Sequence, residues 1–138
     1  MRNYLLLSIL LFVCACKKES ASNNPAMDTV QSGAMAEAKG FFQNGPYGTV
    51  TGVGKVVRNG NNTFDVILDS FMTDNGPDLY VYLSKEVMPV TFIEVGKLKA
   101  TSGTQVYPLT SLPDLTQYKY ICIHCKAFNH LFGYASFK

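Results

Sequence analysis

From residue 40 onward, apolar and polar residues alternate over short stretches, and each stretch ends at turn-forming residues. A two-residue alternation is typical of a β-strand with one buried face. Residues 79–83 are the clearest example, because three aliphatic side chains fall on one face and Tyr80 and Tyr82 on the other. The tyrosine face is either a second core layer or a recognition surface. The expected strands are residues 49–58, 63–70, 79–83, 92–95, 104–109, 119–125 and the C-terminal stretch.

The segments between these stretches carry strong turn signals. Asn59-Gly60-Asn61-Asn62 is typical of a hairpin, because Asn and Gly tolerate positive φ angles, and residues 73–78 form a second turn around Gly76-Pro77. About seven short strands without a long helical periodicity predict an all-β fold, either an antiparallel β-sandwich or a flattened barrel. We expect this domain to span residues 40–138.

The N-terminal residues have the pattern of a bacterial lipoprotein signal. Arg2 is positively charged, and residues 5–13 are almost entirely apolar. That run is too short for a membrane span, which needs about 20 apolar residues, and has the length of a signal-peptide core. Val13-Cys14-Ala15-Cys16 resembles a lipobox, with an aliphatic residue at position −3 and a small residue before the acceptor cysteine. The resemblance implies a signal peptide over residues 1–15 and lipidation of Cys16.

The alternative is an ordinary secretory signal in which both cysteines are incidental. More than one acyl chain on Cys16 would anchor the protein stably, whereas a single chain does not. Lys17 at the second mature position resembles lipoproteins that are sent on to the outer membrane of Gram-negative cells. We therefore expect a cell-envelope protein that a lipid anchors to the membrane, in the outer membrane of a Gram-negative bacterium.

The segment between the acceptor cysteine and the expected β domain, residues 16–39, has a different composition. It is rich in Ser, Asn, Ala and Gly and contains no aromatic residue. Such a composition predicts a flexible tether, which as a random coil would hold the domain roughly 25 Å from its anchor. Residues 35–39 could form one helical turn within it.

Charge and motif content exclude several classes of function. The 138 residues contain 12 Lys and Arg against 10 Asp and Glu, for a net charge of +2, and the basic residues are scattered, so we expect no nucleic-acid partner. The sequence has no phosphate-binding glycine loop, no Gly-x-Ser-x-Gly motif and no obvious carboxylate pair for glycoside hydrolysis. It therefore shows no hydrolase or transferase apparatus and requires no cofactor, and we expect no metal site.

The candidate chemistry lies between residues 121 and 137, where Cys122 and Cys125 form a C-x-x-C motif. A redox pair needs a helix N-terminus, and residues three apart on a strand point to opposite faces, too far apart for a disulfide. A zinc site built from these cysteines and His130 would lack a fourth ligand. Two interpretations remain open: one cysteine is a core residue and the other carries chemistry, or both are buried inert thiols.

Motifs along the whole β region resemble one known family. Residues 75–83 are similar to its Gly-Pro-Asp-Leu-Tyr-Val-Tyr-Leu segment, and residues 114–135 to its C-terminal signature. Its opening and central segments resemble Gly40-Phe41-Phe42, Gly52, residues 96–99, Gly103, Gln105 and Tyr107. The family is the DM-thirteen domain, often labelled electron-transfer DM-thirteen, and the resemblance covers residues 40–137.

The resemblance implies a β-rich domain of the kind found alone in bacterial envelope proteins, or beside heme-binding DOMON domains in animals. The near-invariant cysteine of the family, proposed to be redox-active, corresponds to Cys125, whereas Cys122 falls on an ordinary apolar strand position. His124 stands where the family usually has tryptophan. Its imidazole would either lie beside the thiol and promote its ionisation or fill a surface position, and we expect the surface position.

These observations predict a lipid-anchored envelope protein with a thiol-based redox or electron-transfer role centred on Cys125 and a redox partner protein. His124, His130 and Asp78 are candidate supporting residues, although Asp78 is most simply a turn residue that satisfies backbone N–H groups. The alternative is a non-catalytic surface binding or scaffold module with inert core cysteines. Heme or metal binding through Cys125 with either histidine is a third, weaker hypothesis.

Overall fold

The computed structural model describes residues 19–138, so the expected signal peptide and Cys16 lie outside the described residues. The described part is all-β, which confirms the predicted fold class. Its nine strands are β1 (Ala26–Met27), β2 (Met35–Asn44), β3 (Val50–Arg58), β4 (Phe64–Thr73), β5 (Leu79–Ser84), β6 (Phe92–Lys97), β7 (Ser102–Leu109), β8 (Tyr120–Cys125) and β9 (His130–Ser136). Between residues 19 and 138, no helix has the length and apolar character needed to cross a membrane.

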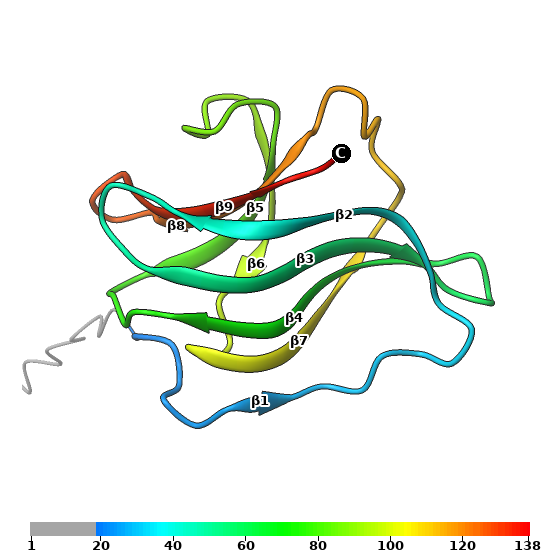
Figure 1. The fold of residues 1–138 in the computed structure, drawn as a ribbon, viewed down its shortest axis with the longest axis horizontal. Helices are drawn as coiled ribbons and strands as arrows, with labels where there is room; N and C mark the ends of the chain where they lie inside the picture. The colour runs from blue at the N-terminus through cyan, green and yellow to red at the C-terminus, as the bar shows by residue number, and fades with distance from the viewer. Residues whose placement is uncertain (1–18) are drawn as a thin grey trace, which may run out of the picture.

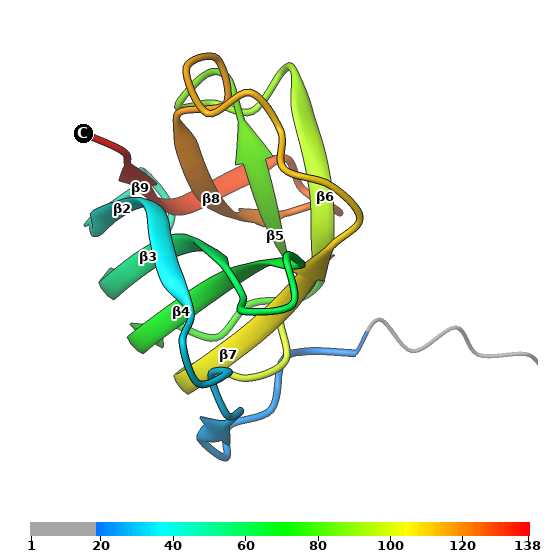
Figure 2. The ribbon, with the colours of Figure 1, turned by 90° about the vertical axis from the view of Figure 1, so that its right-hand side faces the viewer.

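The strands form one sheet in the order β1-β7-β4-β3-β2-β9-β8-β5-β6 (Figure 1). All neighbours are antiparallel except β1 and β7, which are parallel. The sheet curls into a half-barrel, with β7, β4 and β3 in one wall and β8, β5 and β6 in the other (Figure 2). The expected sandwich or flattened barrel is thus a single curled sheet.

Strand β2 forms the corner between the two walls. Its first part pairs with β3, and its last residues, Phe42 to Asn44, pair with β9. At the corner, a side chain on Gly40 would collide with the backbone carbonyl of Ser136, so the two strands approach closely only because residue 40 is glycine. This corner brings the C-terminal signature beside the start of the β domain.

The main core lies between the two walls. The alternation in β5 correctly predicts which face of the strand is buried, because Leu79, Val81 and Leu83 belong to this core. Tyr82 lies on the opposite face in a second cluster, which contains Cys122 and Leu131 and packs against Tyr80, Val87, Tyr120 and Tyr134. The tyrosine face is therefore a second core layer on the outside of the β5–β8–β9 wall.

Residues 20–28 pair with or pack on the sheet, and residues 35–39 belong to β2, in contrast to the flexible tether that their composition predicts. Ser20 pairs with Pro77, and Ala21 is 8% exposed and belongs to the main core. Asp28 forms an ion pair with Lys99 and accepts a hydrogen bond from the Val106 N–H at 2.9 Å. The expected helical turn over residues 35–39 is wrong, because β2 begins at residue 35. The backbone of this segment pairs with β7 and β3 through hydrogen bonds. Such backbone pairing cannot be read from amino-acid composition.

Candidate functional site

Cys125 is the last residue of β8, where it faces the main core and is 1% exposed. Its thiol donates a hydrogen bond to the Pro77 carbonyl, with Sγ 2.9 Å from the oxygen. The next backbone N–H, from Lys126, donates to the Asp78 carbonyl at 3.1 Å. The end of β8 therefore holds the turn that precedes β5 through two consecutive hydrogen bonds.

The shape of this turn depends on two of its residues. Asp78 has a φ of +61°, a left-handed conformation that Asp tolerates better than most residues. A Cβ atom at Gly76 would lie 2.6 Å from Cζ of Phe132, so the turn packs tightly on that ring only because residue 76 is glycine. The role of Asp78 is thus backbone geometry and a carbonyl acceptor, and the Gly76-Pro77-Asp78 turn covers the Cys125 thiol.

Cys122 lies on the opposite face of β8, in the outer cluster, and is 0% exposed. Its Sγ is 3.4 Å from the Val87 carbonyl oxygen, and burial raises the pKa of its thiol to about 12. Both cysteines are free. As the strand alternation predicts, the two thiols of the C-x-x-C motif share neither a disulfide nor a face from which they could bind one zinc ion.

His124 is 5% exposed, so the expected surface position is wrong. Its ring lies 5.3 Å from Tyr82 on the outer face, away from the thiol that follows it in the strand. Nε2 is 3.1 Å from Oδ1 of Asn129, whereas Nδ1 is buried without a hydrogen-bond partner. Burial lowers the pKa of His124, the bond to Asn129 opposes this shift, and the nearby His130 adds to it.

His130 is opposite Cys125 in the β8–β9 pairing, but its ring stacks on Tyr47 of the β2–β3 loop. The two ring centroids are 3.7 Å apart and the planes differ by 2°, and Phe128 lies 5.9 Å from the imidazole on another side. We call Tyr47, Phe128 and His130 the aromatic tip. No pattern in the sequence indicates this group, since its members come from two loops and a strand end.

A model of the family described as electron transfer DM13 matches residues 41–137. The chain belongs to this family. Comparisons with curated proteins and with solved structures found no match. The matched region begins in β2 and includes all later strands, so the DM13 domain and the curled sheet coincide except for β1 and the start of β2.

The two sequence segments that most resemble the family lie side by side in this DM13 domain. Residues 75–83 contain the turn and all of β5 except Ser84, and residues 114–135 contain β8, which pairs with β5 along its whole length. The contact between Cys125 and Pro77 is the point where the two segments meet. The family resemblance and the geometry therefore indicate the same candidate site.

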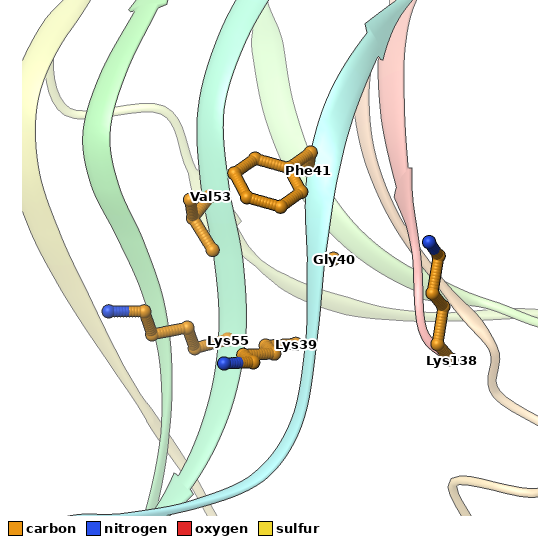
Figure 3. Close-up of a pocket in the computed structure, with 6 residues that line it drawn as sticks. All are labelled: Lys39, Gly40, Phe41, Val53, Lys55 and Lys138. Carbon is orange, nitrogen blue, oxygen red and sulfur yellow. The ribbon is translucent and has the colours of Figure 1, made fainter.

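A pocket of about 370 Å³ lies elsewhere on the DM13 domain, over β2 and β3 (Figure 3). Phe41 and Val53 form its apolar side, and the ammonium groups of three lysines surround it: Lys39, Lys55 and Lys138. Lys55 forms an ion pair with Asp69 at 2.6 Å. The pocket contains neither cysteine nor histidine, so it is not part of the candidate thiol site.

Of the residues suggested as metal or heme ligands, Cys125 and His130 are cross-strand partners, and the His130 ring stacks on Tyr47. Among residues 19–138, no three His, Cys, Asp or Glu side chains form a group that could hold a metal ion. Cys122 and His124 face one side of β8 and Cys125 the other. The chemistry that this site can offer is therefore that of a single thiol under a turn.

Proposed function

We propose that this DM13 protein is anchored by a lipid on Cys16 in the bacterial outer membrane and takes part in electron transfer through the thiol of Cys125. Membership of the electron transfer DM13 family supports the general role. One observation carries the choice of residue: the Cys125 thiol hydrogen-bonds to a turn whose Pro77 is exposed, whereas the Cys122 thiol is enclosed and has a pKa raised to about 12.

The reaction requires the turn to open, because the thiol proton is held by the Pro77 carbonyl and the side chain is 1% exposed. Once exposed and deprotonated, the sulfur attacks one oxygen of a hydroperoxide. The S–O bond forms as the O–O bond breaks, two electrons pass from sulfur to the peroxide, and hydroxide or alkoxide leaves. A thiol of a partner protein then displaces water from the sulfenic acid to form a mixed disulfide, which passes the oxidation on.

Hydrogen peroxide and the sulfenic-acid reagent dimedone test this reaction on the full protein. We expect a dimedone adduct on Cys125 in the wild type and in Cys122→Ser, and no adduct in Cys125→Ser, as read by peptide mass spectrometry. Adducts confined to Cys122, or no adduct on either cysteine while the protein stays folded, would refute the role of Cys125.

A non-catalytic surface binding or scaffold module is the second candidate function. The specific observation in its favour is that both thiols are almost completely buried, at 0% and 1% exposure. In that case Cys125 is a core residue that fixes the turn, and peroxide oxidises it only when denaturant unfolds the domain. A partner that copurifies equally well with Cys125→Ser would support this function.

A further inference from the structure

The described chain is attached to the sheet almost from its first residue. Ser20 pairs with Pro77, Ala21 packs in the main core, and Ser22 exchanges backbone hydrogen bonds with Lys99 and Thr101 at 3.1 and 2.9 Å. Ser20 is thus the first described residue that pairs with another segment. It lies beside the turn that covers Cys125, because Pro77 is the partner of both residues.

This attachment limits how far the domain can lie from a lipid on Cys16, and the inference rests on the anchor proposed above. Ser20 is only four residues after Cys16. Four successive Cα–Cα steps span at most about 15 Å in any conformation. The end of the half-barrel that carries Pro77 must therefore lie close to the bilayer surface, nearer than a flexible tether of the length expected from composition would place it.

The β2–β3, β4–β5 and β8–β9 loops lie at this end of the half-barrel (Figure 1). The β2–β3 loop is joined to β9 through the Tyr47 N–H and the Leu131 carbonyl at 3.2 Å. It is joined to the β4–β5 loop through the Thr49 N–H and the Asp74 carboxylate at 2.8 Å. The side chain of Asn75 in turn donates to Asn23 of the N-terminal segment at 3.1 Å. The N-terminal segment and the loops that bear the aromatic tip therefore form one connected surface.

The aromatic tip gives this surface the chemistry of a membrane interface. Tyr47 is 55% exposed and Phe128 is 59% exposed, and both pack around the His130 ring. Aromatic rings favour the headgroup region of a bilayer. The occupant that fits both the short distance and these side chains is lipid.

We infer that the aromatic tip contacts the bilayer in which the Cys16 lipid is inserted. The domain then lies with the Gly76-Pro77-Asp78 turn and Cys125 directed toward the membrane. A reaction partner of the thiol approaches from the lipid side.

The chain contains no tryptophan, so a single introduced indole reports on its own position. We would place one at the tip, Phe128→Trp or Tyr47→Trp, and one at Gly60 in the β3–β4 hairpin as the matched control. A Cβ atom at Gly60 would meet no atom within 4 Å, so we expect Gly60→Trp to be tolerated. The lipidated full-length protein is reconstituted in phosphatidylethanolamine and phosphatidylglycerol vesicles whose acyl chains are brominated.

We expect the bromine atoms to reduce the emission of both tip tryptophans by roughly half and to leave that of Gly60→Trp unchanged. If the protein carries its lipid but bromine leaves the tryptophan emission of all three variants unchanged, the inferred orientation is wrong and the proposed lipid anchor is still supported. Blue-shifted tip emission that bromine does not quench would show a protein contact and would also overturn it. If the intact mass shows no acyl group on Cys16, the proposed anchor fails and this orientation fails with it.

Discussion

The two thiols of the C-x-x-C motif are buried to almost the same extent, but different parts of the structure cover them. Both are almost fully buried, but Cys122 is enclosed by the outer cluster and Cys125 lies under a single turn. Turns open at a lower free-energy cost than the centre of a sheet, because fewer contacts are lost. The assignment of reactivity to Cys125 therefore depends on the mobility of residues 76–78.

His124 makes the stability of the fold depend on pH. Burial lowers its pKa below the ordinary value of 6.5, so between those two values the unfolded chain binds more protons than the folded chain. The contribution to the free energy of unfolding is complete above pH 6.5 and is lost as the pH falls toward the lowered pKa. We expect His124→Phe to remove this loss.

Urea unfolding between about pH 7.5 and about pH 5.5 measures the effect. Tyr120→Phe, which changes a neighbouring ring in the same outer cluster but keeps the imidazole, should retain the wild-type decrease. If His124→Phe loses stability over this range as steeply as the wild type does, the buried imidazole is not the cause.

Sequence reasoning located these side chains in part. Alternation placed Cys122 and Cys125 on opposite faces, because side-chain direction in a strand depends only on local geometry. It did not reveal the bond from Cys125 to Pro77, since these residues are 48 positions apart in the chain and meet only because β5 and β8 are neighbours. His124 was misplaced because it lies beside Tyr82 on the outer face of the wall, where a second cluster of buried side chains covers that face.

Strand β2 joins the two walls, and its glycine, Gly40, decides whether the sheet can turn. A Cβ at Gly40 would collide with backbone atoms of Ser136, which cannot rotate away as a side chain can. We expect Gly40→Ala to lower the free energy of unfolding by about 3 kcal/mol or more, because the β2–β9 pairing must shift.

The matched variant is Gly60→Ala, in the open hairpin between β3 and β4, where an added Cβ meets no atom within 4 Å. Its free energy of unfolding should stay within about 0.5 kcal/mol of the wild type. Equal stability of the two alanine variants in urea unfolding would show that the corner does not depend on close backbone approach.

Most strands could be predicted from the sequence, and the missed ones share a physical cause. Strands β3 to β9 contain branched and aromatic residues between turn signals. Strands β1 and the start of β2 consist mainly of small and polar residues, and they are held by backbone pairing with β7 and β3. The strand order was not predictable, because it depends on which backbones meet after the sheet has curled.

In the half-barrel, the N-terminal segment lies beside the turn that covers Cys125. Ser20 and Cys125 both contact Pro77, so the start of the described chain and the candidate thiol are at the same end of the molecule. A lipid at Cys16 would therefore fix not only the location of the domain but also the direction from which Cys125 is reached.

Alkylation of the folded, lipidated protein with iodoacetamide, followed by peptide mass spectrometry, tests the assignment to Cys125 most directly. Cys122 and Cys125 are the two free thiols of the described chain, so each reports on its own environment. We expect Cys125 to be labelled first. Gly76→Ala, which forces the turn away from Phe132, should accelerate labelling of Cys125 and leave Cys122 unchanged. If both thiols stay unlabelled until urea unfolds the domain, and Gly76→Ala does not change this, Cys125 is an inert core residue.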